Sequence, residues 1–476
     1  MKCFYKYAIL LLAISQSCDG RSHLHSKTPS LATIPTKDVA VGKKAAFTSK
    51  KVVTSLNGGD AGAKSTMKAA TFNLVKGIVG AGVLSLPAGV AAFGDNKGAV
   101  IPGVILVSIA GALSGYNFSL IGRVCAYTGA TSYAGAWENS IGEATAWIPA
   151  GACTCKTFLA VLAYSMILAE TFQAIFASVG ISATRSQSLI ALTCTVLLPL
   201  CLMKNLASLA PFSLLGIIGM LLTVVCMGVR YFDGSYALPD GKFLKDLSEQ
   251  PLFGAKGASA VFSPNSFILV CMLSTAYMAH FNAPKFYNEL ENNTIQRFNA
   301  LVSTSFIISI IFFSIATALG FSTFGANSAG FILTNYSSKD SLIGLSRILV
   351  AFALIFTYPL VFVGCRDGFL SLFRVPKEKQ TNAFLNNLTY FLLSLVTLAA
   401  MNLKDLSFVM SFGGATLGNA LIYILPALMF KKAVKDMGNN ATPSLKSEVN
   451  FAMFSATLGV GMGIIGSTMA LKGLKD

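Results

Sequence analysis

Long runs of apolar residues, separated by polar segments, dominate the chain beyond residue 70. The runs are continuous rather than alternating, and a membrane-spanning helix needs about 20 such residues. Eleven runs reach or approach that length. They cover residues 71–93, 98–122, 152–178, 187–203, 206–231, 265–282, 299–324, 342–365, 384–402, 406–429 and 449–471. The pattern predicts an all-α polytopic membrane domain over residues 70–476.

The composition fits a chain that lies largely within a bilayer. Hydrophobic residues make up 54% of the 476 residues and charged residues 12%, whereas a soluble domain carries about 25% charged residues. Mean hydropathy is +0.65. We therefore expect the lipid bilayer as a partner and one polytopic domain without an attached soluble module.

Motifs of catalysis and metal binding are missing from the sequence. It contains no Walker-type GxxxxGK[ST], no HExxH and no serine-elbow motif. Cys153 and Cys155 lie at the mouth of a predicted span, but no histidine and no second cysteine pair accompanies them. We therefore expect no enzyme, no cofactor and no metal site. Without a nucleotide-binding segment, any transport by this chain would have to be driven by an ion gradient or by the gradient of the substrate itself.

A basic tail precedes the first span. Residues 1–70 hold eleven Lys or Arg and three Asp, so half of the formal net charge of +16 lies there. Residues 1–20 have the layout of a secretory signal peptide, with an apolar stretch from Ala8 to Ile14. Residues 21–69 fit either a transit segment or a disordered basic tail. The tail lacks interleaved aromatic residues, so nucleic acid is not an expected partner.

The basic residues also predict orientation. If residues 1–70 face the cytoplasm, eleven spans place most basic loop residues on that same side, as the positive-inside bias requires. A cleaved signal peptide would instead deliver the tail to a lumen. The signal peptide and the positive-inside bias are compatible if the tail is imported further, into the matrix of an organelle, as happens with two-part plastid leaders. Such leaders usually have an aromatic residue at the cleavage point, and residues 17–19 contain none. We favour an organellar membrane or endomembrane, with the plastid envelope as one option, over the plasma membrane.

The first predicted span combines an apolar run with glycines and one lysine. Thr71–Phe93 reads TFNLVKGIVGAGVLSLPAGVAAF. Gly77, Gly80 and Gly82 weaken the helix, and Lys76 is costly at membrane depth. This combination indicates a binding site rather than a simple membrane anchor.

Three stretches of the chain carry a family resemblance. Phe72–Pro87 reads FNLVKGIVGAGVLSLP, Leu198–Gly216 reads LPLCLMKNLASLAPFSLLG, and Ala279–Glu291 reads AHFNAPKFYNELE. In this order they resemble the amino acid/auxin permease family of the amino acid, polyamine and organocation transporter superfamily. Within this family, the sequence resembles two branches, the sodium-coupled neutral amino acid transporters and the proton-coupled amino acid transporters. The resemblance covers roughly residues 66–475 and is specific for the family but not for the substrate.

The resemblance implies a LeuT-like architecture of two inverted five-helix repeats, spans one to five and six to ten, with an eleventh span added. It also implies that spans one and six are discontinuous. The backbone N–H and C=O groups of a broken helix are tolerated at membrane depth only where they line a cavity. There the N–H groups can receive a carboxylate, and carbonyl oxygens at the facing break can accept from an ammonium. An α-amino acid carries both groups on one carbon.

The expected substrate site lies at these two breaks. In the first span it comprises Gly77, Ile78, Val79, Gly80, Ala81 and Gly82. In the sixth span it comprises Ser274, Thr275, Ala276 and Tyr277, with Leu273 and Met278 as further candidates for an apolar wall. The competing interpretation is helix packing through small residues. We favour packing only for Gly459 and Gly463 of the eleventh span.

Lys76 is the expected ion-coupling residue. By the register of the motif, it stands where sodium-coupled relatives place a residue of the sodium site between spans one and eight, and some proton-coupled relatives have lysine there. An ammonium can replace the cation, and a buried lysine can release and take up a proton. Thr357 in the eighth span is the candidate partner. The alternative is a lysine that snorkels or is tied permanently to carbonyl groups.

Glu170, His280 and Arg347 are further ionisable residues within predicted spans. Glu170 in the third span is a second ion-coupling candidate, although a structural bond to a neighbouring helix is equally compatible with it. His280, near the end of the sixth span, is expected to titrate or to cap the helix at the interface. Arg347, early in the eighth span, is expected to snorkel to the surface.

These observations predict a secondary transporter of small neutral amino acids that is proton-coupled and sodium-independent. A sodium-coupled or facilitative amino acid transporter is the first alternative. A transporter-like amino acid sensor, which binds its ligand without useful flux, is the second.

Overall fold

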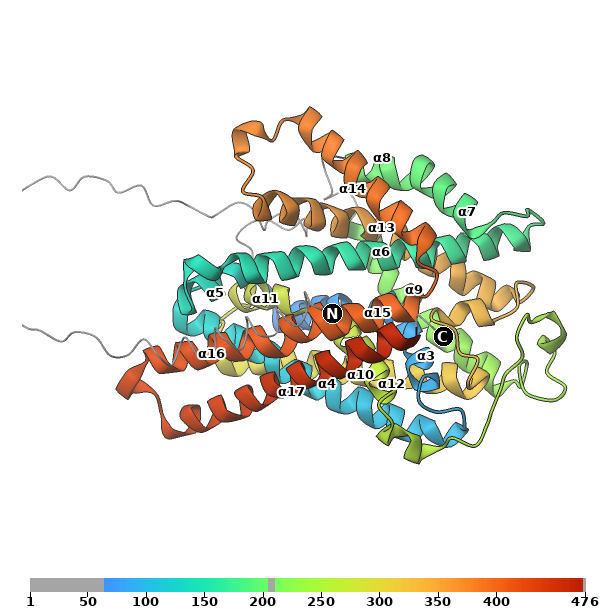
Figure 1. The fold of residues 1–476 in the computed structure, drawn as a ribbon, viewed down its shortest axis with the longest axis horizontal. Helices are drawn as coiled ribbons and strands as arrows, with labels where there is room; N and C mark the ends of the chain where they lie inside the picture. Colours follow the sequence, from blue (N-terminus) through green and yellow to red (C-terminus); the bar gives the residue numbers. More distant parts are fainter. Residues whose placement is uncertain (1–63, 204–209, 474–476) are drawn as a thin grey trace, which may run out of the picture. The chain divides into compact units, whose positions relative to one another are not determined.

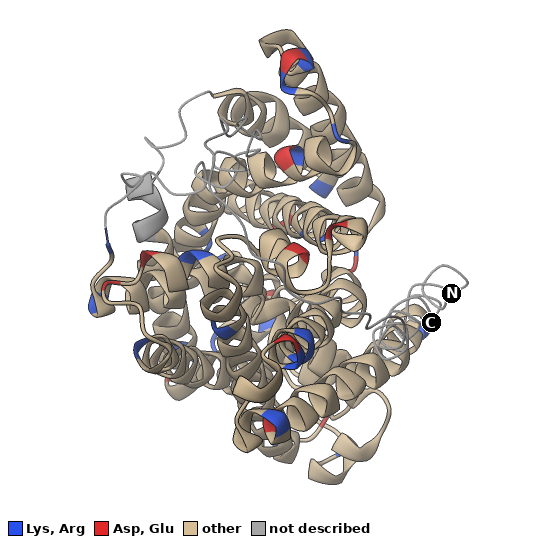
Figure 2. Ribbon diagram, turned by 90° about the vertical axis from the view of Figure 1, so that its left-hand side faces the viewer, with Lys and Arg blue, Asp and Glu red and all other residues tan. Residues whose placement is uncertain are grey.

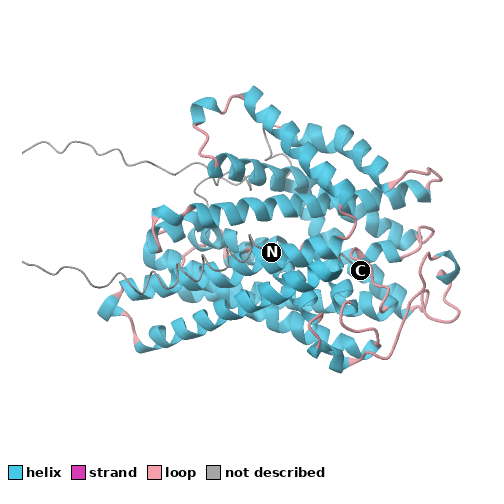
Figure 3. Ribbon diagram, viewed as in Figure 1, coloured by secondary structure: helices cyan, strands magenta, loops and turns pink. Residues whose placement is uncertain are grey.

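The computed structural model describes residues 64–203 and 210–473, and for residues 210–215 it describes the backbone alone. The described residues are helices joined by loops, with two isolated β-bridges between loops (Figure 1, Figure 3). Nine helical segments within these ranges are long and apolar enough to cross a membrane, and a bent pair forms a tenth. The predicted signal peptide at residues 1–20 and residues 21–63 of the predicted tail lie outside the described residues.

Each of the eleven predicted spans corresponds to a helix or a group of helices. The first five are α2 (Met67–Ile78) with η1 (Ala81–Ser85) and α3 (Leu86–Ala91), α4 (Val100–Thr128), α6 (Trp147–Ser178), α7 (Arg185–Leu192) with η4 (Thr193–Leu197) and α8 (Leu198–Leu202), and α9 (Ala210–Phe232). The next five are α10 (Ser266–Ala276) with η8 (His280–Asn282) and α11 (Ala283–Glu289), α12 (Ile295–Phe324), α13 (Ser341–Leu372), α14 (Asn382–Asn402), and α15 (Leu406–Gly413) with η11 (Gly414–Gly418), η12 (Ala420–Ile424) and α16 (Leu425–Asp436). The last is α17 (Pro443–Gly473), and a short α5 (Tyr133–Ser140) lies between spans two and three.

Successive spans run in opposite directions, which defines two ends of the helical unit. We call the end where α2 begins and α4, α11, α13 and α16 finish the proximal end, and the other the distal end (Figure 1). The basic residues expected on the side of the tail that the structure describes lie at or near the proximal end: Arg123, Lys285, Arg297, Arg366, Arg374, Lys377, Lys379, Lys431, Lys432 and Lys435. Lys204 lies outside the described residues. Figure 2 views the helices from the left-hand side of Figure 1, and most of the ribbon carries no charge.

Spans with the same position in the two halves pack against each other. The first pairs with the sixth through α3 and α10, the second with the seventh through α4 and α12, and the third with the eighth through α6 and α13. The fourth also contacts the ninth, because α7 and α8 pack against α14. Two inverted repeats that interlock around a common axis produce this pairing.

Glycine allows several of these helices to approach closely. A Cβ added at Gly122 of α4 would lie 2.1 Å from the Phe298 ring of α12, and one at Gly459 of α17 would lie 2.7 Å from Cβ of Tyr423. Contacts this short leave no room for a larger residue. Gly459 therefore serves helix packing, as the sequence predicts.

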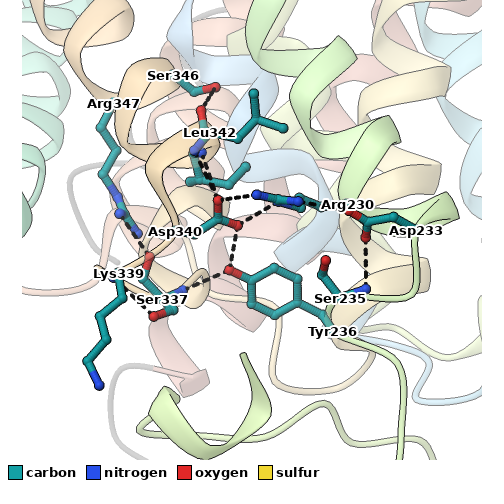
Figure 4. Close-up of polar contacts among 11 residues, drawn as sticks. Arg230, Asp233, Ser235, Tyr236, Ser337, Lys339, Asp340, Leu342, Ser346 and Arg347 are labelled. Atoms are coloured by element: carbon teal, nitrogen blue, oxygen red, sulfur yellow. Dashed lines mark hydrogen bonds and ion pairs between the residues drawn. The ribbon is translucent and has the colours of Figure 1, made fainter. Parts of the chain in front are cut away.

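Asp340 is the centre of a polar network at the distal end (Figure 4). Its buried carboxylate accepts hydrogen bonds from Nε and Nη2 of Arg230 at 2.9 and 2.8 Å and from the Tyr236 hydroxyl at 2.9 Å. Burial and the neighbouring Asp340 charge raise the pKa of Tyr236, so that its hydroxyl keeps its proton and acts as a donor. Asp340 also caps α13 by accepting from the N–H of Leu342 at 3.1 Å. The network ties the end of α9 to the start of α13.

Arg347 belongs to the same region, and the prediction that it snorkels to the surface is wrong. It is 3% exposed, and its guanidinium donates to the carbonyl oxygens of Leu333 and Tyr336 at 2.9 and 2.7 Å. It also donates to the Ser337 carbonyl oxygen at 3.2 Å (Figure 4). The loop between α12 and α13 folds over the start of α13 and supplies these acceptors. Arg347 thus fastens the loop to the eighth span.

Candidate functional site

The first span is interrupted where the sequence predicts it. α2 ends at Ile78, Val79 and Gly80 are extended, and η1 resumes the helix at Ala81, with a bend of 40° between the two parts. The carbonyl groups at the end of α2 and the N–H groups at the start of η1 have no partner within their own helix, because a helix end leaves these groups unpaired. A Cβ added at Gly77 or Gly80 would meet no described atom within 4 Å. The break is therefore not filled by packing.

The sixth span is also interrupted, but slightly later than predicted. Ser274, Thr275 and Ala276 form the last turn of α10 and are not unwound, whereas residues 277–279 leave the helix before η8 and α11. The sequence contains the signal for this position in Pro284, at the start of α11. Proline lacks an N–H and clashes with the carbonyl four residues earlier, so it fits the first turn of a new helix.

The structure brings the two breaks together. η1 and α3 pack against α10, and a Cβ added at Gly82 would lie 4.0 Å from Cα of Ala276. The start of the helix after the first break thus adjoins the end of the helix before the second. N–H groups from one span and carbonyl groups from the other flank the same place in the core.

The polar side chains expected to bind substrate in the sixth span bond to other helices instead. The Ser274 hydroxyl donates to Oδ1 of Asn419 at 2.8 Å, and the Thr275 hydroxyl donates to the carbonyl oxygen of Met410 at 2.7 Å. The Tyr277 hydroxyl donates to the Val107 carbonyl oxygen at 3.1 Å. These bonds hold the break in position between the second and tenth spans.

The tenth span is the element that sequence reasoning missed. Its helix changes to π-helical turns at η11 and η12, on both sides of Asn419, and such turns are frequent at functional sites. A Cβ added at Gly414 would lie 1.7 Å from the carbonyl oxygen of Cys271 in α10. The signal in the sequence was the glycine run at 413, 414 and 418, which permits this close approach to the sixth span.

Lys76 lies in the last turn of α2, two residues before the helix ends at Ile78, and is partly exposed. Its position fits the predicted role, since a cation there adjoins the carbonyl groups at the end of α2. The hydroxyl of Thr357, the expected partner, donates to the Ala353 carbonyl oxygen of its own helix at 2.8 Å. Coupling through Lys76 and Thr357 stays a prediction.

Glu170 lies near the distal end of α6 and has an ion-pair partner. Its carboxylate is 3.6 Å from Nε of Arg185 in α7, and Arg185 donates to the Ala400 carbonyl oxygen of α14 at 2.7 Å. The pair connects spans three, four and nine. This arrangement corresponds to the second interpretation of Glu170, a structural bond to a neighbouring helix.

His280 is fully buried rather than interfacial, so the prediction of an interfacial cap is wrong. Its Nε2 lies 2.9 Å from the Ser114 carbonyl oxygen of α4 and therefore donates to it. The rings of Phe118 and Phe306 surround the imidazole. His280 anchors the sixth span, just after its break, to the second span.

Lys156 is a buried charged residue that the sequence analysis overlooked. It is 6% exposed and lies nine residues into α6. The predicted span began at residue 152, which placed Lys156 near the membrane surface, whereas α6 begins at Trp147. Hydropathy does not locate the start of a helix that extends beyond its apolar run.

Comparison with known proteins agrees with this geometry. The family model described as transmembrane amino acid transporter protein matches residues 63–470. The mouse protein named "Putative sodium-coupled neutral amino acid transporter 11" is 23% identical over 429 residues, which cover 88% of each chain. The Arabidopsis thaliana protein "Amino acid transporter AVT6E" is 23% identical, with 86% of this chain and 84% of that one covered. "Vacuolar amino acid transporter 2" of Saccharomyces cerevisiae is 23% identical, with 76% and 75% covered.

A solved structure shares the fold. The crystal structure of MhsT in complex with L-phenylalanine matches with a TM-score of 0.51 at 14% sequence identity, over 84% of this chain and 98% of that chain. The protein is thus a polytopic membrane transporter of the LeuT-like fold, as the resemblance predicts. Within that class, the chain belongs to the family of transmembrane amino acid transporter proteins. It is not an enzyme.

Proposed function

We propose that the protein is a secondary transporter that moves small neutral amino acids through alternating access around the two breaks. The observation that carries the proposal is the juxtaposition of the first break, at Val79 and Gly80, with the second, at residues 277–279. Unpaired N–H groups there favour a carboxylate, and unpaired carbonyl groups favour an ammonium. The α-amino acid backbone presents these two groups together.

The neutral character of the substrate follows from the side chains around the breaks. Contacts to Gly82 and Thr275 come from the uncharged Met410, and Ser274 bonds to the uncharged Asn419. Neither Met410 nor Asn419 can neutralise a charged substrate side chain, and moving an unpaired charge out of water is costly. The relatives named for neutral amino acids support the same substrate class.

The coupling ion in this proposal is the proton, through Lys76 at the end of α2. An ammonium at this position occupies the place and charge of a bound sodium ion, and loss of its proton would empty that place. Thr357 is the proposed partner when the first and eighth spans come together. Glu170 is assigned the structural role, because it already has Arg185 as a partner.

An organellar membrane is the proposed location. The tail composition supports it, and one of the relatives is named as a vacuolar transporter. The proximal end, where α2 begins and the basic residues listed above lie, would face the cytoplasm or the interior of the organelle.

Uptake into liposomes containing the purified protein tests the proposal. Labelled neutral amino acids are offered with an imposed proton gradient, a sodium gradient or neither, to the native protein, to Lys76→Asn and to Lys68→Asn. Lys68 is an exposed lysine on the same helix and serves as the control. Proton-driven accumulation that Lys76→Asn abolishes, and Lys68→Asn leaves intact, would support both parts of the proposal.

Other outcomes separate its parts. Sodium-driven accumulation by the native protein would overturn the role of Lys76 and leave amino acid transport in place. Binding of amino acids without flux under any gradient would overturn transport and favour a sensor.

A further inference from the structure

Met410 of α15 contacts both broken spans. Its carbonyl oxygen accepts the hydrogen bond from Thr275, in the last turn before the second break, at 2.7 Å. The end of its side chain packs on the first span, because a Cβ added at Gly82 would lie 2.9 Å from Cε of Met410. Gly82 is two residues beyond the first break at Gly80. Met410 is 4% exposed and so lies within the core between these spans.

The residues that follow Met410 extend the same contact surface. A Cβ added at Gly413 would lie 2.9 Å from Cδ1 of Leu159 in the third span, and one at Gly414 would lie 2.9 Å from the Thr275 hydroxyl. The segment 410–414 thus meets spans one, three and six at one place. Its two glycines contribute no side chain, and the Met410 side chain packs on the first span.

We propose that Met410 determines substrate size by packing against the side chain of the bound amino acid. The inference rests on the proposed function, since the substrate backbone is taken to bind between the two breaks. Met410 contacts each span two residues from its break, so a ligand held by both breaks would lie close to it. Methionine is unbranched and flexible, so its thioether end can yield to ligands of different shape.

Gly82 and Met410 form a pair that can be tested together. The atom nearest to a new Cβ at Gly82 is the flexible end of Met410 rather than backbone. Gly82→Ala is therefore compatible with folding, but it displaces the thioether end and reduces the room beside the breaks. Removal of that end in the double variant Gly82→Ala/Met410→Ala restores the room.

The experiment measures kcat/KM for uptake of labelled alanine, leucine and phenylalanine in proteoliposomes. Met410→Ala is expected to raise the ratio of kcat/KM for phenylalanine to that for alanine about tenfold, the lower end of the range for one methylene group in an apolar site. Gly82→Ala is expected to lower the same ratio, and the double variant is expected to recover it. Met429→Ala is the matched control, because Met429 is a fully buried methionine of the same span, in α16. Its loss removes core packing in α16, nineteen residues further along the span than Met410.

The outcomes distinguish the inference from the function on which it rests. Uptake with an unchanged ratio in Met410→Ala, or an equal change in Met429→Ala, would overturn the role of Met410 while transport stands. A double variant that remains as impaired as Gly82→Ala would also overturn it. Absence of amino acid uptake by the native protein would instead overturn the proposed function, and the inference with it.

Discussion

Ser65 and Leu290 lie side by side at the proximal end and join the two broken spans. The N–H of Ser65 donates to the Glu289 carbonyl oxygen at 2.7 Å, and the N–H of Glu291 donates to the Ser65 carbonyl oxygen at 2.9 Å. Ser65 lies two residues before α2, and Glu289 is the last residue of α11. The proximal halves of spans one and six are thus connected by backbone bonds, which we expect to make them move as one body.

A disulfide between cysteines at positions 65 and 290 is expected to leave transport intact. Adjacent extended segments lie about 5 Å apart, which is within the range of a disulfide. The measurement compares uptake by Ser65→Cys/Leu290→Cys before and after reduction. Each single variant, treated with the same oxidant, controls for the native cysteines. Uptake that stops on oxidation and returns on reduction would show that the two halves must separate.

Glu170→Gln is expected to keep gradient-driven uptake and to lower stability. The substitution removes the charge that faces Arg185 and leaves that guanidinium partly buried with fewer acceptors. Breaking a partly buried pair costs more than an exposed one, so the loss should be on the order of 1–3 kcal/mol. Thermal unfolding in detergent and proton-driven uptake measure the two effects. Loss of proton dependence with unchanged stability would contradict the structural role and restore Glu170 as a coupling residue.

Asp340→Asn is expected to destabilise the protein more than Asp233→Asn. The Asp340 carboxylate is fully buried and accepts from Arg230, Tyr236 and the start of α13. Its loss leaves Arg230 with the more exposed Asp233 as its partner and removes the buried half of the pair, and breaking a buried pair costs about 3–5 kcal/mol. Asp233 also pairs with Arg230, but its side chain is 34% exposed, so its loss should cost well under half as much. Equal shifts of the unfolding temperature would contradict this ranking.

Alanine at two glycines of spans one and two is expected to act in opposite directions. Gly122→Ala places a Cβ 2.1 Å from the Phe298 ring and should destabilise the fold by about 1–3 kcal/mol through overpacking. Gly77→Ala meets no described atom within 4 Å and should stabilise α2 by up to about 1 kcal/mol through helix propensity. Thermal unfolding of both variants checks the signs. A destabilised Gly77→Ala would show that the end of α2 must be free to unwind.

The positions of the spans were predictable because hydropathy reports burial in lipid directly. All eleven runs became helices, and the break in the first span appeared at the glycines that predicted it. The sixth span was less predictable. Ser274, Thr275 and Ala276 form a run of small residues that was expected to unwind. The hydroxyl groups of Ser274 and Thr275 instead bond to the tenth span, and the helix ends only at Ala276.

Charged residues show the limit of sequence reasoning most clearly. Arg347 seemed able to reach the surface because its distance along the helix is all that a sequence gives. The loop between α12 and α13 lies outside the apolar run of the eighth span, but it folds back over Arg347. Its three carbonyl oxygens accept from the guanidinium, and the loop buries the side chain. Glu170 likewise acquired a partner, Arg185, only through the turn that joins spans three and four.

The sequence by itself determined the family, the order of the spans and the break in the first span, because these depend on local composition and on motifs within one segment. Only the tertiary structure decided which residues surround the two breaks. Met410 and Asn419 of the tenth span lie more than 100 residues from their partners in the sixth, and such contacts are fixed by packing between helices, which no single segment encodes.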